Sequence, residues 1–443
     1  MTGNQLDAHD PRSVSLRKRA VVAAGVGTLA EFFDYASYSY LATTIAAVFF
    51  PAGDKAAALL QTFALFALSF AMRPVGGLFW GRFGDRKGRK KALELTIIGM
   101  GLATFSIGLL PGYAAIGIWA PILLVSMRLL QSFFTAGEYS GAAVLVGEFA
   151  PPSKRGRYVS VVPISCALGF LLASTLASFL HGSLGEQQML SWGWRVPFLV
   201  AGVITVSGWY VRRAIEETPD FAAVLAENSV SNSPLTILLR EHWRVLARLL
   251  CVMGVNAAGY YLVLGYMATY LEVEGGLTAS RAAAITSIAL LAYLPLLYLS
   301  AVLSDRIGRR RVLMASALLF VLLSYPAFKV LESGGFSTML LIQLLLVAVF
   351  ALNDGSFAAY FVEAFPPTVR FSGFALPFNV GVVVFGGTTP LLATWLIQNT
   401  GNELMPAFIM MAVASMGLLA LMFSQEKSPM ARDELSRRTE LPV

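Results

Sequence analysis

The chain has 443 residues, of which 56% are hydrophobic and only 13% are charged, and its mean hydropathy is +0.67. Because soluble globular chains carry about 25% charged residues, this composition excludes a water-soluble globular protein. The formal net charge of +7 would suit a protein that binds nucleic acid. However, the basic residues lie in loops at one end of the apolar segments, so nucleic acid is not an expected partner.

Apolar segments of about 20 residues or more, long enough to cross a bilayer, recur along the chain. We therefore predict an all-α membrane protein with twelve transmembrane helices. The predicted spans are residues 20–49, 56–80, 92–111, 117–147, 157–181, 192–212, 244–271, 280–303, 312–331, 337–362, 371–398 and 404–424.

The longest polar interval between spans divides the chain into two groups of six. We expect an N-terminal segment, a first six-helix lobe, a linker, a second six-helix lobe and a tail, at residues 1–19, 20–212, 213–243, 244–424 and 425–443.

Lysine and arginine gather in alternate loops, which the positive-inside rule assigns to the cytoplasm. The loop clusters are Arg82, Arg86, Lys87, Arg89, Lys90 and Lys91, then Lys154, Arg155 and Arg157, then Arg212, Arg213 and Arg240, then Arg306, Arg309, Arg310 and Arg311, and finally Arg370. The pattern predicts a multi-pass protein of the cell membrane with both termini in the cytoplasm.

Two loops carry near copies of one motif, and we call them the first signature loop (Gly81–Lys90) and the second signature loop (Ala301–Arg310). A second pair of similar segments begins at Glu148 and Glu363, so the two halves of the chain read as parallel repeats. Charges at such helix ends can pair in one conformation and separate in another. The predicted gating residues are Asp85, Arg86, Arg89, Glu148, Arg155, Asp305, Arg306, Arg309, Glu363 and Arg370.

Ionisable residues also occur inside the predicted spans, where a charge costs about 2.5–3.5 kcal/mol on insertion scales. Such an acid either pairs with a neighbouring helix or faces a watery cavity and carries a proton. The candidates for proton coupling are Glu31, Asp34, Glu138 and Asp354, with Asp34 placed first.

Polar residues at helical spacing accompany these acids. Arg128 and Gln131 share a face of span 4, and the planar guanidinium of Arg128 could hold a substrate carboxylate bidentately. Equally, Arg128 could form a structural ion pair with Glu31, Asp34 or Glu138. Tyrosine rings could surround a quaternary ammonium group, and lone amides in apolar helices need internal partners. The predicted substrate-binding residues are Tyr35, Tyr38, Arg128, Gln131, Asn256, Tyr260, Asn353 and Asn379.

The first signature loop resembles the signature loop of the major facilitator superfamily. Together with Arg73–Gly77, Gly137–Tyr139, Trp192–Pro197 and Glu216–Pro219, it makes the chain similar to the metabolite:proton symporters. Within that family, the stretches Gly117–Leu124 and Met405–Ala407 most resemble the proline/betaine branch. The resemblance implies two lobes with alternating access around a midplane cavity. It also implies proton-coupled uptake of a small zwitterion or organic acid of the proline or glycine betaine kind.

Several other functions are weighed against this one. No P-loop motif is present, and His9, His181 and His242 lie far apart in the predicted topology, so we expect neither an enzyme, a cofactor nor a metal site. A di- or tricarboxylate:proton symporter would need more than one deep cation, and Arg73 is the weaker second candidate after Arg128. A proton-coupled exporter stays open. The expected partners are a small solute, protons and the lipid bilayer, with the chain acting as a monomer.

Overall fold

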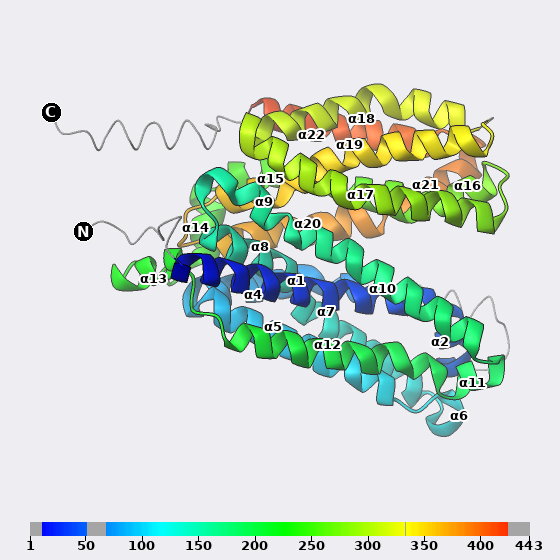
Figure 1. Ribbon diagram of the computed structural model, residues 1–443, viewed down its shortest axis with the longest axis horizontal. Coiled ribbons are helices and arrows are strands. Elements are labelled where there is room, and N and C mark those ends of the chain that lie inside the picture. Colours follow the sequence, from blue (N-terminus) through cyan, green and yellow to red (C-terminus); the bar gives the residue numbers. More distant parts are fainter. Residues whose placement is uncertain (1–10, 51–67, 333, 424–443) are drawn as a thin grey trace. The chain divides into compact units, whose positions relative to one another are not determined.

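The computed structural model describes residues 11–50, 68–332 and 334–423. The predictions for residues 1–10 of the N-terminal segment, for residues 56–67 of the second span and for the tail 425–443 lie outside the described residues. The described residues are almost entirely helical (Figure 1).

Among the described residues, ten helical stretches are long and apolar enough to cross a membrane, and they coincide with the third to the twelfth predicted spans. The first predicted span falls on two successive helices, α1 (Pro11–Tyr40) and α2 (Ala42–Phe49), and is not among these ten. The helix α1 carries Glu31 and Asp34, whose charges lower its hydropathy.

The chain divides into two compact units. Unit 1 comprises residues 1–149, 164–237 and 366–376, and unit 2 comprises residues 150–163, 238–365 and 377–443. Three of the boundaries fall inside helices, namely α10 (Val161–Ser183), α14 (Pro234–Glu241) and α20 (Arg370–Gly381). Each unit therefore contains a short segment that follows one of the two repeated Glu148 and Glu363 motifs.

Unit 1 is built from helices of the first half of the chain and the first turns of α20. Besides α1, α2 and most of α10, these are α4 (Met72–Lys87), α5 (Arg89–Leu109), α6 (Tyr113–Ile116), α7 (Trp119–Thr135), α8 (Glu138–Phe149), α11 (Glu186–Ser191), the 3₁₀ turn η2 (Gly193–Arg195), α12 (Val196–Arg213) and α13 (Pro219–Ala226). Within this unit α1 packs against α8 and α12, and α5 packs against α7 and α12. These contacts bring the polar faces of α1, α5, α7 and α8 together.

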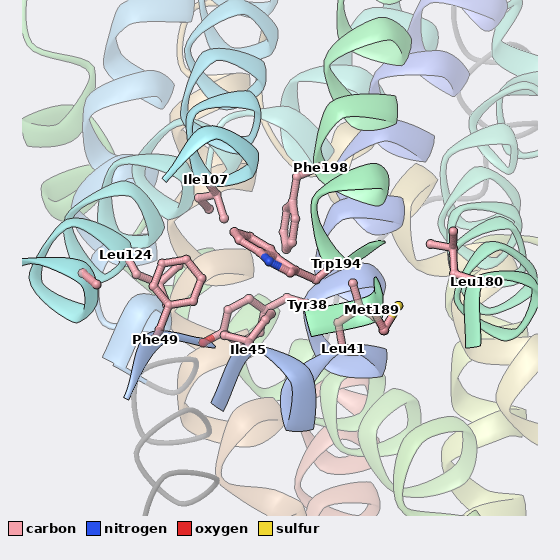
Figure 2. Close-up of a cluster of buried hydrophobic side chains, with 11 residues drawn as sticks. Tyr38, Leu41, Ile45, Phe49, Ile107, Leu124, Leu180, Met189, Trp194 and Phe198 are labelled. Atoms are coloured by element: carbon pink, nitrogen blue, oxygen red, sulfur yellow. The ribbon is translucent and has the colours of Figure 1, made fainter. Parts of the chain in front are cut away.

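An apolar cluster packs behind the polar face of α1 (Figure 2). Trp194 lies at its centre, with the ring of Phe49 at 5.2 Å and that of Phe198 at 6.2 Å between centroids. Tyr38 belongs to the same cluster and is 1% exposed. Because interiors pack as densely as organic crystals, this cluster holds Tyr38 in one place and so shapes one wall of the polar site described below.

Unit 2 is built mostly from helices of the second half of the chain. They are α9 (Arg155–Val159) with the preceding turn η1 (Pro152–Lys154), α15 (Trp243–Gly259), the π-helical segment η3 (Tyr260–Tyr266), α16 (Met267–Val273), α17 (Ala279–Ile307), α18 (Arg309–Leu331), α19 (Phe336–Glu363), the π-helical segment η4 (Val382–Gly387), α21 (Thr389–Thr400) and α22 (Met405–Met422). The short helix α14 (Pro234–Glu241) crosses from one unit to the other. Within unit 2, α17 packs against α19, and α18 packs against both α19 and α22 (Figure 1).

Candidate functional site

Glu31 of α1 forms an ion pair with Arg73 of α4. The NH2 atom of Arg73 lies 3.1 Å from a carboxylate oxygen of Glu31, and its Nε donates to the Tyr35 hydroxyl at 3.3 Å. The guanidinium carbon also lies 5.0 Å from the centroid of the Tyr35 ring. All three side chains are buried, so this pair ties α4 to the polar face of α1.

Asp34 stands one turn further along α1 and belongs to a separate group. Its carboxylate accepts a hydrogen bond from the Gln131 amide and lies 3.8 Å from the NH1 atom of Arg128. Gln131 in turn accepts from Arg128 at 2.6 Å and donates to the Thr104 hydroxyl at 2.7 Å. Of the three acids that sequence alone left open as partners for Arg128, the structure places Asp34 beside it.

Aromatic rings close around Arg128, which is fully buried. Its guanidinium carbon lies 4.2 Å from the Tyr38 ring centroid and 5.6 Å from that of Tyr35. A guanidinium on an aromatic face is attracted to the ring quadrupole, and its weak hydration makes it the cation best suited to a buried site. Asp34, Arg128, Gln131 and the two tyrosines therefore form one buried polar group.

Glu138 forms a third ion pair, with Arg212 at the end of α12. Both guanidinium NH atoms of Arg212 donate to the carboxylate, the NH1 contact measuring 2.8 Å, and NH1 also donates to the Leu93 carbonyl at 2.7 Å. The Thr96 hydroxyl donates to the same carboxylate at 3.0 Å. This pair joins α5, α8 and α12 and has almost all of its hydrogen bonds satisfied inside unit 1.

The position of Arg212 corrects the sequence-based expectation that it is a loop cation. It is 2% exposed and turned into the unit, where Nε and NH2 donate to the Ala23 carbonyl of α1 at 3.3 Å. A Cβ atom at Gly27 would lie only 1.8 Å from this guanidinium, so the missing side chain makes room for it. An arginine at the end of an apolar segment looks the same in sequence whether it points to water or inward.

Asp354 of α19 lies in unit 2 and has neutral hydrogen-bond donors around it. Asn256 of α15 donates to one carboxyl oxygen at 2.8 Å, and the Tyr293 hydroxyl of α17 lies 2.5 Å from the other. The same Asn256 amide donates to Asn353 at 3.1 Å. The structure thus groups three predicted residues, and it adds Tyr293, which sequence reasoning did not assign to the site.

Two further predicted substrate-binding residues, Tyr260 and Asn379, belong to unit 2. Tyr260 is the first residue of η3, and the centroid of its ring lies 6.3 Å from that of Phe350. Tyr293 stacks on the same Phe350 ring, with the centroids 5.7 Å apart. Asn379 is fully buried on α20. The group around Asp354 and the group around Arg128 belong to different units.

Asp85 of the first signature loop binds the first turn of α20. Its two carboxylate oxygens accept from the backbone N–H groups of Phe371 at 3.0 Å and Ser372 at 2.8 Å. The first N–H groups of a helix lack partners within it and carry partial positive charge. A Cβ atom at Gly84 would lie 1.9 Å from the Phe371 ring, so this glycine of the motif is needed for the close approach.

Arginines and acids surround this contact and form a first charge network with it. Arg89 lies 3.4 Å from Asp85 and 3.3 Å from Glu148, and Arg370 lies 2.9 Å from Glu148. Burial raises the pKa of Asp85 to about 6, although Arg89 and the two backbone N–H groups favour the ionised form. The cost of burying this carboxylate is thus larger than the stabilisation that Arg89 and the hydrogen bonds give its charge.

Asp305 of the second signature loop makes the equivalent contact in unit 2. It accepts from the backbone N–H groups of Gly156 at 2.8 Å and Arg157 at 3.1 Å in α9. Arg309 pairs with it at 2.7 Å and lies 3.4 Å from Glu363. Arg155 pairs with Glu363 at 3.5 Å.

Two of the predicted gating residues, Arg86 and Arg306, are exposed and take no part in the contacts just described. Sequence reasoning missed three linker residues that do contact the first network. Glu217 accepts from the backbone N–H of Arg89 at 3.0 Å, Asp220 lies 2.5 Å from Arg370, and the Phe221 ring lies 4.7 Å from the Arg89 guanidinium. The motif Glu216–Pro219 was the available signal.

Comparisons with known proteins agree with this architecture. The family model described as "Sugar (and other) transporter" matches residues 20–231, and the model described as "Major Facilitator Superfamily" matches residues 249–443. The chain is 35% identical to the proline/betaine transporter of Salmonella typhimurium over 412 residues, which is 91% of this chain and 82% of the relative. It is likewise 35% identical over 420 residues to the glycine betaine/proline/ectoine/pipecolic acid transporter OusA of Dickeya dadantii, covering 92% and 83%.

Among solved structures, the proton:xylose symporter XylE bound to 6-bromo-6-deoxy-D-glucose is similar with a TM-score of 0.76. The similarity covers 96% of this chain and 99% of XylE at 17% sequence identity, which shows the fold alone. The predicted fold of helices in two repeated halves is confirmed by this likeness. The matched families and relatives are transporters and not enzymes.

The Glu138–Arg212 pair leads to a prediction about stability. Glu138→Gln and Arg212→Gln each leave one buried charge without its partner, so each is expected to lower the stability of the folded protein by about 3–5 kcal/mol. The double variant is expected to lose less than the sum of the two, because no uncompensated charge remains. The thermal midpoint in detergent measures this, with the exposed Glu186→Gln as a control that leaves it unchanged. Single variants as stable as the parent would contradict a structural ion pair.

Proposed function

The chain belongs to the major facilitator superfamily, and we propose that it takes up a small zwitterion or organic acid of the proline or glycine betaine kind together with protons, by alternating access. Relatives that bear the names of proline/betaine transporters match it over 91% of its length. The observation that carries the proposal is the buried Arg128, held beside Asp34 by Gln131 and enclosed by two tyrosine rings.

In this proposal Arg128 receives the carboxylate of the substrate. A guanidinium presents paired donors in the geometry of a carboxylate, and such charge-assisted contacts are the strong ones in proteins. Asp34 lies 3.8 Å away and already uses the neighbouring Gln131 amide. A substrate carboxylate that arrives at Arg128 therefore competes with Asp34 for the same cation.

This competition provides the coupling between substrate and proton. Once the substrate neutralises Arg128, Asp34 would be a buried carboxylate without its counter-charge, which is costly in the middle of a membrane protein. Taking up a proton removes that cost. Proton binding at Asp34 and substrate binding at Arg128 thus favour each other, and the coupling is reciprocal because it is a binding free energy.

The number of deep arginines bears on the main alternative, a di- or tricarboxylate:proton symporter. A substrate with two or three carboxylates needs a second deep cation, and Arg73 is the second candidate after Arg128. Arg73 is held by Glu31 at 3.1 Å, so a second carboxylate would have to displace that acid as well. One exchangeable arginine favours a substrate with a single carboxylate.

We expect uptake in proteoliposomes to test this assignment directly. With a pH gradient imposed, the purified protein should accumulate labelled proline or glycine betaine but not citrate or 2-oxoglutarate. Asp34→Asn, which is fixed as neutral, should lose uphill accumulation and keep exchange of internal for external substrate. Arg128→Gln should raise the KM by about tenfold or more, as the loss of a charge-assisted hydrogen bond of about 1.5–3 kcal/mol implies.

Glu31, the other acid of span 1, supplies the control. Glu31→Gln breaks the separate pair with Arg73, so the comparison shows which acid of span 1 carries the proton. Accumulation by Asp34→Asn under the same gradient would refute coupling at this residue. Accumulation of citrate would favour the alternative substrate class, and release of preloaded solute under an inward proton gradient would favour an exporter.

We further propose that the two signature-loop networks are gates, which close when Asp85 and Asp305 hold the first turns of α20 and α9 and open when they release them. Each aspartate holds the N-terminus of a segment that follows the equivalent motif of the other half. Releasing these contacts would free the two helix starts together. The cost of burying the charge of Asp85, which raises its pKa, supports such a reversible role.

A neutral substitution tests the first gate. Asp85→Asn should slow transport by about tenfold or more, because two hydrogen bonds to a charged acceptor are weakened, each of about 1.5–3 kcal/mol. The KM for substrate should stay nearly unchanged, since the pocket is not altered. The neighbouring Arg86→Gln is the matched control, because Arg86 is exposed in the same loop. An unchanged transport rate at normal expression would leave Asp85 with no gating role.

The distribution of basic loops supports the proposal that both termini and the signature loops lie in the cytoplasm. Ser229 in the linker and Ser337 at the start of α19 are both exposed, so each accepts a cysteine without disturbing packing. A membrane-impermeant thiol reagent added to intact cells should label Ser337→Cys and leave Ser229→Cys unlabelled until the cells are opened. The reverse pattern would invert the topology, and labelling of both would contradict an even number of spans between the N-terminus and the linker.

A further inference from the structure

Asp354 differs from the other acids buried in the predicted spans. Three of those acids lie beside an arginine: Glu31 beside Arg73, Asp34 beside Arg128, and Glu138 beside Arg212. Within the part of the chain that the structure describes, Asp354 contacts no basic side chain. Its recorded partners are the amide of Asn256 and the phenol of Tyr293.

The surroundings of Asp354 are buried. Asp354 is 4% exposed and Tyr293 is fully buried, stacked on Phe350 with ring centroids 5.7 Å apart. Asn256 comes from α15, Tyr293 from α17 and Asp354 from α19, so three helices hold the carboxyl group. Among the described residues that contact the carboxyl group of Asp354, Tyr293 is the one with a titratable side chain.

An ionised carboxylate in such a place has no counter-charge. Burying an isolated charge is so unfavourable that the group usually becomes neutral instead, and this holds more strongly inside a membrane. A protonated carboxyl, in contrast, carries no charge that needs a partner. In the structure one oxygen accepts from Asn256, and the other accepts from the Tyr293 hydroxyl at 2.5 Å.

We propose that Asp354, held by Tyr293 and Asn256, is a second proton-binding site, occupied by a proton when no substrate is bound. It differs from the group around Asp34, where the arginine keeps the acid ionised until a substrate carboxylate arrives. The effect of this site on transport rests on the proposed proton-coupled function. The presence of a proton at the site does not, because it is argued from the burial and the contacts of Asp354 alone.

The neighbouring backbone gives the proton a way to affect conformation. The π-helical segment η3 begins at Tyr260, four residues after Asn256, and the ring of Tyr260 contacts Phe350. Short π-helical insertions occur frequently at functional sites. A proton on Asp354 lets α15, α17 and α19 pack around a neutral group, and its loss would leave a bare charge beside η3.

Infrared difference spectroscopy on the full-length protein in lipid, without substrate, tests the occupancy. At neutral pH the parent should show the carbonyl band of a protonated carboxyl that Asp354→Asn removes and Asp34→Asn keeps. Tyr293→Phe should move the band, because one hydrogen bond to the carboxyl is lost. A spectrum that Asp354→Asn leaves unchanged would overturn the proposal, whatever the transport assays give.

Exchange transport tests the consequence. As the pH is raised beyond the point where Asp354 loses its proton, exchange by the parent should fall about tenfold per unit, the slope of a single titrating group. Asp354→Asn cannot lose a proton, so its exchange should stay level over the same range. An equal fall of exchange in the parent and in Asp354→Asn would count against the site. It would also count against the site if a sodium gradient at equal pH drove accumulation by the parent and Asp354→Asn abolished that accumulation. A parent that shows no pH-driven accumulation, but keeps the infrared band, would refute the proposed function and leave this site standing.

Discussion

Every charge inside this protein has to be matched, because water is not available there to stabilise it. Inserting a charged side chain into a bilayer costs about 2.5–3.5 kcal/mol or more, and a buried pair recovers that cost only with good geometry and further hydrogen bonds. Unit 1 meets this requirement with arginine–acid pairs between helices α1, α4, α7, α8 and α12. These pairs differ in geometry, and our proposals treat one as structural and another as exchangeable. Glu138 and Arg212 are enclosed by carbonyls and a hydroxyl, whereas Arg128 meets Asp34 at 3.8 Å through a shared glutamine.

The internal repeat extends the same requirement to the helix ends. A helix N-terminus that is buried against other helices needs acceptors for its free N–H groups, and Asp85 and Asp305 supply them in equivalent positions of the two halves. Each aspartate is in turn neutralised by the arginine four residues later. One short motif therefore provides both an acceptor and its counter-charge on adjacent turns. Its repetition makes the two units structurally similar without making their buried polar groups alike.

Much of the fold and part of the site were predictable from sequence, for physical reasons. Apolar length and loop charges are local properties, so ten predicted spans coincide with helices of suitable length and composition, and the family resemblance carried by the signature loops is confirmed. Pairing between helices is not a local property. Arg128 had three possible partners, and only the packing of α1 against its neighbours leaves Asp34 next to it. Arg212 was placed in a loop because its inward turn depends on Gly27 in another helix, and Tyr293 was one aromatic residue among many.

The two units solve the problem of a buried carboxyl group in different ways, and this asymmetry matters for a carrier. Beside Asp34 the counter-charge is a permanent cation, so in the proposed function a competing anion takes that cation and Asp34 then binds a proton. Beside Asp354 the partners are an amide and a phenol, which carry no positive charge, so in our proposal a proton neutralises the carboxyl group before any substrate is bound. Under these proposals unit 1 binds the substrate carboxylate and a proton together, because the two compete for one arginine, whereas unit 2 binds a proton alone.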